Sequence, residues 1–300
     1  MRFDSPFSGT VTYDEVSDRA ETIDLGDTPR EMRDNFVRLL LGDEPAADTR
    51  PTVTLGGVPC RLSGRDALDG YTGPVALWFH GGGYVFGSPE THVRPVEVFA
   101  KALRMPVLAV RYRLAPESPW PAQLEDARAV ADALQADGHA LYLAGDSAGG
   151  HLALNLAIAL GKAGAPPKAI ALFSPNTDRT ELNATRDLHT LTDPIVDDGF
   201  DRMLAGLCFG PGGLPPDHPE VSPVYADLSV LCRTHIEIGG RELLRDDSAV
   251  LYAFAKTQGA DITLHETPGA FHMWQVWTPW LREGTESLER AAAMLLGGDR

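Results

Sequence analysis

A serine with the surroundings of a catalytic nucleophile occurs in the pentapeptide Gly145-Asp-Ser-Ala-Gly149. The short apolar run at 140–144 predicts a strand buried on both faces, and residues 148–162 predict a helix. Glycines at both ends of the pentapeptide allow a tight strand-to-helix turn. Such a turn holds the Ser147 side chain out of the sheet, near the positive end of the helix. This context is typical of a nucleophilic serine, and the alternative is a plain N-cap serine.

A second chemical pattern is the run His80-Gly81-Gly82-Gly83-Tyr84, which directly follows an apolar run at 75–79. Consecutive glycines leave backbone N–H groups uncovered, so that they can converge on an anion. Fixed donors of this kind stabilise the negative charge that an ester carbonyl gains as it becomes tetrahedral. The alternatives are a flexible turn and a phosphate-binding loop. Against the second, Phe86 stands where a dinucleotide-binding loop needs glycine, and no Gly-Lys-Ser/Thr sequence follows.

A serine hydroxyl becomes a good nucleophile only when a base takes its proton. We expect this base to be a histidine late in the chain, because hydrolases with a serine at such a turn place the acid and then the histidine after it. His272 lies in a loop just past the last predicted strand, 261–265, from which it can reach the serine. The alternative for His272 is a surface position beside a hydrophobic helix. His235 and His265 belong to predicted strands, so we assign them structural roles.

The acid that orients the histidine is expected after the strand predicted at 235–238. The candidates are Glu242, Asp246 and Asp247. Asp246 or Asp247 directly precedes a helix predicted at 248–258, where a short carboxylate can cap free N–H groups. Glu242 lies nearer the strand end. We therefore select Glu242 as the acid and keep Asp246 as the main alternative.

Other polar and aromatic residues near these patterns have weaker interpretations. We expect Asp146 to support the turn through backbone hydrogen bonds. Arg113 and Glu117 are expected to form an ion pair, either buried or solvated.

Tyr84 and Phe86 either line the acyl pocket or simply pack in the core. No metal site is predicted, and a solvated face is expected for three acidic residues without cation-ligand spacing, Asp193, Asp197 and Asp198.

Strands and helices alternate from residue 74 onward, which requires crossover connections. This order predicts an α/β fold with a mainly parallel, twisted sheet flanked by helices. Before this region, residues 30–41 predict an amphipathic helix and 52–62 a hairpin around Gly56-Gly57. The other expected strands are 107–111 and 168–173, and the other expected helices are 91–103, 123–136 and 285–296.

Two segments are expected to cover the carboxyl edge of the sheet, where ligands bind in such folds. Residues 177–227 contain several prolines and glycines with one helical stretch, at 200–207, and are too long for a plain loop. We predict that this insertion forms a small helical cap together with an N-terminal segment, 1–50. The catalytic domain would then span 51–300.

Composition excludes several classes of function. The 300 residues are 43% hydrophobic and 23% charged, as in ordinary globular proteins. The net charge of −16 disfavours binding to nucleic acid or to an anionic membrane surface. No apolar run reaches the ~18 residues of a membrane span, and the first residues lack the apolar core of a signal peptide. Three widely spaced cysteines are a poor disulfide framework, so the cytoplasm is the expected location.

The two glycine-rich blocks, extended to His80–Ser88 and Gly145–His151, resemble the signatures of hormone-sensitive-lipase-like esterases, bacterial family IV of the α/β-hydrolase fold. The segments 112–117 and 119–122 add to this resemblance, which covers roughly residues 74–296. It implies the α/β-hydrolase fold and hydrolysis of short acyl esters or small lactones, without a cofactor. Dimerisation is common among such relatives, and a homodimer is compatible with the sequence.

The same resemblance implies roles for individual residues. The backbone N–H groups of Gly82, Gly83 and Ala148 would form the oxyanion hole. At the acid position the family more often has an aspartate followed by a proline. Here the sequence reads Gly239-Gly-Arg-Glu242, which departs from that pattern and looks like a branch of the family that uses glutamate.

Two other functions are compatible with the same fold. Receptor relatives have lost a member of the triad and bind small molecules without converting them, whereas all three candidate members are present here. A serine amidase or peptidase would use the same triad. Prolyl peptidases of this fold usually carry a large extra domain, for which 300 residues leave no room. The sequence therefore favours a serine esterase that acts through an acyl-enzyme.

Overall fold

The computed structural model describes residues 7, 9–43, 45, 47–180, 183 and 186–297, and within them the sheet has the strand order β1-β2-β4-β3-β5-β6-β7-β8. Strands β3 to β8 are parallel, whereas β1 and β2 form an antiparallel hairpin whose second strand pairs with β4. This topology confirms the predicted α/β fold. The strands are β1 (Thr52–Leu55), β2 (Val58–Ser63), β3 (Val75–Phe79), β4 (Val107–Val110), β5 (Leu141–Asp146), β6 (Ala169–Phe173), β7 (Arg233–Gly239) and β8 (Ile262–Thr267).

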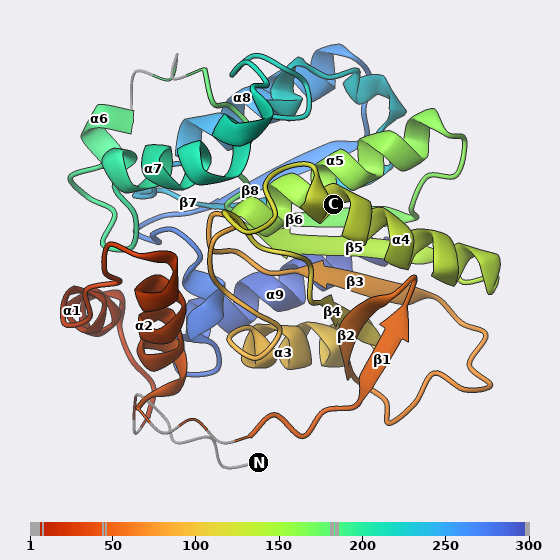
Figure 1. Ribbon diagram of the computed structural model, residues 1–300, viewed down its shortest axis with the longest axis horizontal. Helices are drawn as coiled ribbons and strands as arrows, with labels where there is room; N and C mark the ends of the chain where they lie inside the picture. Colours follow the sequence, from red (N-terminus) through yellow and green to blue (C-terminus); the bar gives the residue numbers. More distant parts are fainter. Residues whose placement is uncertain are drawn as a thin grey trace.

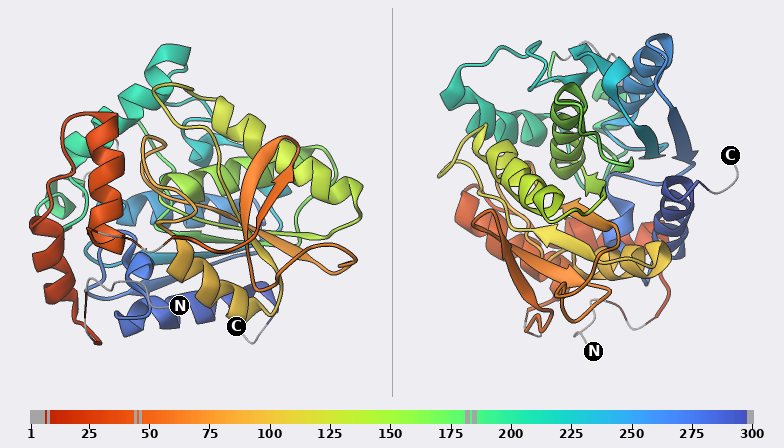
Figure 2. Two further views of the ribbon diagram at one scale, coloured as in Figure 1. Left: turned by 60° about the horizontal axis from the view of Figure 1, so that its bottom comes forward. Right: turned by 90° about the vertical axis from the view of Figure 1, so that its right-hand side faces the viewer.

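Helices cover both faces of the sheet (Figure 1; Figure 2). On one face, Trp78 of β3 packs against Phe99 and Phe173, with ring centroids 5.4 and 5.3 Å away. Its neighbours Leu77 and Phe79 belong to the larger apolar cluster on the other face, so β3 is buried along its whole length. The first face carries α3 (Val93–Leu103) and α9 (Arg282–Leu295), and the second carries α4 (Ala122–Ala136), α5 (Ala148–Lys162) and α8 (Arg245–Thr257).

Two helices precede the sheet, α1 (Tyr13–Glu21) and α2 (Pro29–Leu41). Each begins with a capping box, in which a threonine at the N-cap and a glutamate three residues later bond to each other's backbone N–H groups. The structure shows α2 where the helix at 30–41 is expected. Helix α1 is not predicted from the sequence. It is mostly polar and buries only Val16, so its hydrophobic periodicity is weak.

The insertion between β6 and β7 carries α6 (Arg186–His189) and α7 (Asp198–Phe209). These helices lie at the same end of the sheet as α1 and α2 (Figure 1). Asp197 is the N-cap of α7, where its side chain accepts a hydrogen bond from the backbone of Phe200. Residues 181, 182, 184 and 185 of the predicted insertion, and 1–6, 8, 44 and 46 of the predicted N-terminal segment, lie outside the described residues. Among the described helices, none is long and apolar enough to cross a membrane.

The ion pairs after β4 differ from the expected one. Glu117 pairs with Arg33 of α2 at an Nη2–Oε2 distance of 2.7 Å. Arg113 instead pairs with Glu125 and Asp126 of α4. The predicted Arg113–Glu117 pair is therefore wrong, because each side chain pairs with a residue of a neighbouring helix. The Arg33–Glu117 contact fastens α2 to the loop that follows β4.

A buried carboxylate anchors α9 to the sheet. Glu237, in the middle of β7, accepts hydrogen bonds from His235, Ser287 and Arg290, and its Oε2 lies 2.7 Å from the arginine Nη2. Burial alone would raise the pKa of Glu237, but His235 and Arg290 lower it below its ordinary value. The carboxylate therefore stays ionised and holds the arginine.

We expect Glu237→Ala to lower the free energy of unfolding by about 3 kcal/mol, because Arg290 and His235 would lose a buried partner. Urea denaturation followed by circular dichroism measures this difference. The matched control Glu289→Ala removes an exposed carboxylate from the same helix and should change the value by less than about 0.5 kcal/mol. Equal effects of the two substitutions would contradict the anchoring role of Glu237.

Candidate active site

The turn between β5 and α5 holds Ser147 in an uncommon backbone conformation, with φ of 53° and ψ of −121°. A positive φ is strained for serine and persists only where the surrounding structure enforces it. A Cβ on Gly149 would lie 2.0 Å from the carbonyl oxygen of Phe79, and a Cβ on Gly145 would lie 2.3 Å from that of Gly149. Both positions therefore require glycine, and the tight turn presents Ser147 at the carboxyl end of β5.

His272 lies in the loop after β8, and its Nε2 is 2.9 Å from Ser147 Oγ. The structure thus brings together two residues that lie far apart in the sequence. The ring is buried, and burial lowers the pKa of His272 to about 4 because the charged imidazolium would lose its hydration. The neutral ring at pH 7 can accept a proton from the serine. His235 and His265 lie within β7 and β8, as expected.

Glu242 lies three residues after the end of β7 and is fully buried. Its Oε2 accepts hydrogen bonds from Ser174 Oγ at 2.6 Å and from the Gly239 N–H at 3.0 Å. Its Oε1 has no hydrogen-bond partner among the described residues, and the same is true of His272 Nδ1. Burial raises the pKa of the Glu242 carboxyl well above its ordinary value, whereas the hydrogen bonds from Ser174 and from the Gly239 N–H favour its ionised form.

Ser174 connects Glu242 to the histidine loop. Its hydroxyl donates to Glu242 and also accepts a hydrogen bond from the backbone N–H of Met273, at 3.3 Å. A single side chain therefore contacts the carboxylate and the residue next to His272. Ser174 is not among the site residues predicted from the sequence. Its position directly after a buried strand, at the edge of the sheet where ligands bind, does indicate a site residue.

The other two acid candidates have partners away from Ser147. Asp246 contacts Arg245, and Asp247 accepts a hydrogen bond from Asn183 Nδ2 at 2.7 Å. Neither aspartate caps α8, because this helix begins at Arg245 and has Leu244 as its N-cap. The capping role expected for these aspartates is therefore wrong, since the helix starts three residues earlier than its predicted first residue.

Asp193 is buried, so the expectation of a solvated face is wrong for this residue. Its two carboxylate oxygens accept hydrogen bonds from the backbone N–H groups of Ile195 and Leu243, each at 3.0 Å. Burial raises the pKa of Asp193 to about 7, although the N–H groups of Leu243, Ile195 and His272 oppose this rise. The insertion thus contacts the loops that carry Glu242 and His272.

The glycine run after β3 lines the same cavity as Ser147, through Gly82 and Gly83. In the part of the chain that the structure describes, the N–H groups of these two glycines donate to no protein acceptor. Ala148 begins α5, so its N–H has no acceptor within that helix. A Cβ on Gly82 would lie 2.4 Å from the Phe86 carbonyl oxygen, which explains the need for glycine there. Gly82 and Gly83, with uncovered N–H groups, therefore line the same cavity as Ser147.

Asp146 joins the serine turn to the glycine run. Its carboxylate accepts hydrogen bonds from the Gly81 N–H at 3.0 Å, from His92 Nε2 at 3.1 Å and from Trp78 Nε1 at 3.2 Å. Because Gly81 is occupied in this way, only the next two glycines offer their N–H groups to a ligand. Asp146 is thus placed to support the turn, as expected.

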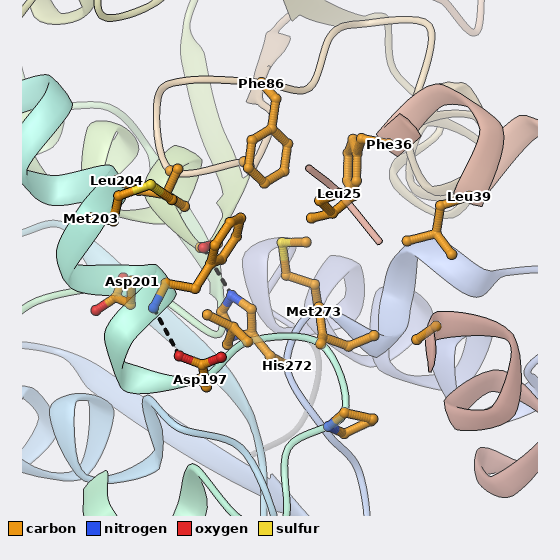
Figure 3. A pocket seen from close by; sticks show the side chains of 18 of the residues that line it. Leu25, Phe36, Leu39, Phe86, Asp197, Asp201, Met203, Leu204, His272 and Met273 are labelled. Atoms are coloured by element: carbon orange, nitrogen blue, oxygen red, sulfur yellow. Dashed lines mark hydrogen bonds between the residues drawn. The ribbon is translucent and has the colours of Figure 1, made fainter. Parts of the chain in front are cut away.

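Ser147 and His272 line a cavity of about 320 Å³. Figure 3 shows His272 among the side chains of this cavity. In Figure 3, Leu25, Phe36 and Leu39 of the N-terminal segment face Met203 and Leu204 of α7 across this space. The cavity therefore has one wall from the start of the chain and another from the insertion. Its size lies near the lower end of the range for small-molecule sites.

The two aromatic residues of the glycine-rich block have different positions. Phe86 lines the cavity. Tyr84 is not among the residues that line it, and its hydroxyl lies 2.6 Å from His151 Nδ1. The Tyr84 ring packs against Trp120 and Phe209, with centroids 5.7 and 6.0 Å away. Of the two roles expected for Tyr84, core packing is therefore the one observed, and its hydroxyl has a buried partner in His151.

Comparisons with known proteins agree with this geometry. The model of a family with the alpha/beta hydrolase fold matches residues 76–276. An acetyl-hydrolase of Streptomyces hygroscopicus is 37% identical over 227 residues, which are 74% of this chain and 75% of that protein. An esterase of Acinetobacter venetianus is 29% identical over 249 residues, covering 79% of this chain and 80% of that protein.

A solved structure described as an esterase from the bacterial hormone-sensitive lipase family superposes on the chain with a TM-score of 0.85. The two sequences are 32% identical, and the superposition covers 94% of this chain and 96% of that one. The fold, the serine at its strand-to-helix turn and these relatives lead to one assignment. The chain belongs to the α/β-hydrolase fold family and, within it, to the hormone-sensitive-lipase-like esterases.

Proposed function

We propose that this esterase hydrolyses short-chain acyl esters or small lactones through a Ser147–His272–Glu242 triad and an acyl-enzyme. The observation that carries the proposal is the 2.9 Å contact between Ser147 Oγ and His272 Nε2, at the base of a cavity edged by uncovered glycine N–H groups. This arrangement supplies a nucleophile, a base and an oxyanion site at one point.

In the first half of the reaction, Ser147 Oγ attacks the ester carbonyl while His272 Nε2 takes its proton. The carbonyl oxygen becomes an oxyanion and accepts hydrogen bonds from the N–H groups of Gly82, Gly83 and Ala148. The tetrahedral intermediate then expels the alcohol, which receives the proton from His272. In a lactone the leaving alcohol stays attached to the acyl chain.

In the second half, His272 takes a proton from water, which attacks the acyl-enzyme and releases the acid with Ser147 restored. Glu242 is assigned as the acid because its Oε1 and the Nδ1 of His272 are both buried without partners, while Ser174 holds the carboxyl beside the histidine loop. A carboxylate next to Nδ1 fixes the tautomer and stabilises the imidazolium that forms in each half-reaction.

The walls of the cavity support a cap function. We assign the described parts of residues 1–50 and 177–227 to a cap over the catalytic domain, because Leu25, Phe36 and Leu39 from the first segment and Met203 and Leu204 from the second line the cavity. Its volume of about 320 Å³ suits small esters. A cytoplasmic location is supported by the three cysteines, which are all free thiols.

We expect Ser147→Ala to abolish hydrolysis of p-nitrophenyl butyrate, because the substitution removes the nucleophile while keeping a small side chain at the turn. A fluorophosphonate probe should label the wild-type protein and leave this variant unlabelled, which also separates an esterase from a non-catalytic binder. Full activity of Ser147→Ala would overturn the proposed function.

We expect Glu242→Gln to lower kcat roughly 10³- to 10⁴-fold, because a neutral amide no longer stabilises the imidazolium. Asp246→Asn is the matched control and should keep kcat within about threefold, since Asp246 pairs with Arg245 outside the cavity. Steady-state kinetics with p-nitrophenyl butyrate measures both effects. The reverse ranking would transfer the acid role to Asp246.

The pH profile tests the state of His272. The neutral ring is the base, so activity is full above the His272 pKa and is lost as pH falls through it. Because burial lowers this pKa to about 4, the acid limb of kcat/KM should lie well below the ordinary histidine value of 6.5. Recovery of activity after transfer from acid to neutral buffer excludes unfolding as the cause. An acid limb at or above 6.5 would contradict the prediction.

A further inference from the structure

Arg179 occupies a distinctive place in the wall of the cavity. Apart from His272, it is the one basic residue among the described residues that line this space. Its side chain is only 10% exposed. Its positive charge also lowers the pKa of His272, which places the guanidinium within electrostatic reach of the catalytic histidine.

The hydrogen bonds of this guanidinium are incomplete. Nη1 donates to Asp201 Oδ2 at 2.6 Å, whereas the buried Nε has no acceptor among the described residues. A guanidinium has five N–H donors, and a buried donor without an acceptor is unfavourable. Asp201 has other hydrogen-bond donors besides Arg179, because Arg186 and Asn176 also donate to its carboxylate. Nη2 also has no acceptor among the described residues and is not among the fully buried atoms, so Arg179 keeps spare donor capacity at the edge of a ligand-sized space.

The charges around Arg179 restrict what it can bind. Four carboxylates line the same cavity, those of Asp24, Asp27, Asp197 and Asp201, and Asp201 already neutralises the guanidinium. A substrate with its own carboxylate would be repelled by this acidic surround. An uncharged oxygen, in contrast, accepts a hydrogen bond from arginine without adding negative charge. Most of the remaining wall is apolar, so such an oxygen would find its donor chiefly at Arg179.

We propose that Arg179 binds a second, uncharged oxygen of the substrate, a carbonyl or ether oxygen separate from the ester being cleaved. This inference rests on the proposed ester hydrolysis and specifies its substrate class: neutral keto- or alkoxy-substituted esters in preference to plain alkyl esters of the same length. The oxygen can belong to the acyl or to the alcohol part, and the experiment distinguishes the two.

The test compares esters that differ only by an oxygen in place of a methylene group. The acyl pair is p-nitrophenyl 3-methoxypropanoate and p-nitrophenyl pentanoate. The alcohol pair is 2-methoxyethyl butyrate and butyl butyrate. For each pair, the ratio of kcat/KM values for the methoxy and the alkyl ester is measured in the wild-type protein and in Arg179→Met. Comparing this ratio between the wild-type protein and the variant cancels the difference in intrinsic reactivity between the two esters. A general loss of folded protein lowers both kcat/KM values alike and also cancels.

We expect the ratio to fall about tenfold or more in Arg179→Met for one of the two pairs, as for the loss of a hydrogen bond from a charged donor. The pair that responds identifies the part of the substrate that Arg179 contacts. Arg179→Lys, which keeps the charge beside Asp201 but lacks the Nε–H, should give a smaller fall, and it carries the test if the methionine variant does not fold. The control Arg202→Met removes a basic residue of α7 outside the cavity lining and should leave both ratios unchanged.

Three outcomes would overturn the proposal. An unchanged ratio in both pairs would show that Arg179 does not recognise a substrate oxygen, even though the esters are hydrolysed. A preference for p-nitrophenyl hemisuccinate over the methoxy ester, lost in Arg179→Met, would show that the ligand is an anion. Absence of hydrolysis of every ester by the wild-type protein would instead contradict the proposed function itself.

Discussion

The sharp turn at Ser147 is the constraint on which the rest of the site depends. Gly149 lies so close to the Phe79 carbonyl that no side chain fits there, and this contact packs the start of α5 against the end of β3. Because β3 and β5 are adjacent and Phe79 pairs with Gly145, the glycine run that leaves β3 emerges beside the serine. One steric requirement thus places Ser147, the proposed nucleophile, and the uncovered N–H groups at the same end of the sheet.

The insertion contributes charged groups to the cavity as well as part of its apolar wall. Asp193 holds the backbone after Glu242, and Asp201 and Arg179 lie in the cavity wall. These groups are buried or nearly so, and their charges act on His272 and Glu242 through a medium that screens them poorly. The electrostatic environment of His272 and Glu242 therefore depends in part on a segment inserted between two strands of the sheet.

Much of the fold could be predicted from local sequence. The strands β3 to β6 are short, largely apolar runs. The helices from α3 onward that flank the sheet have boundaries within a few residues of those expected. The closeness of Ser147 and His272 could also be anticipated, since both follow strands whose carboxyl ends share an edge. What could not be predicted depends on distant partners. Asp193 looks like a solvated acid until the chain buries it, and Glu117 pairs with Arg33 across more than eighty residues.

The wall built from the start of the chain has a consequence for how such enzymes diversify. Leu25, Phe36 and Leu39 shape the cavity, yet they precede the first strand and contribute nothing to the sheet. The residues proposed as nucleophile, base and oxyanion donors all lie after β1, so this wall and the proposed chemistry belong to different parts of the chain. A substitution in this segment can therefore reshape the binding space without altering any strand that carries the proposed catalytic residues.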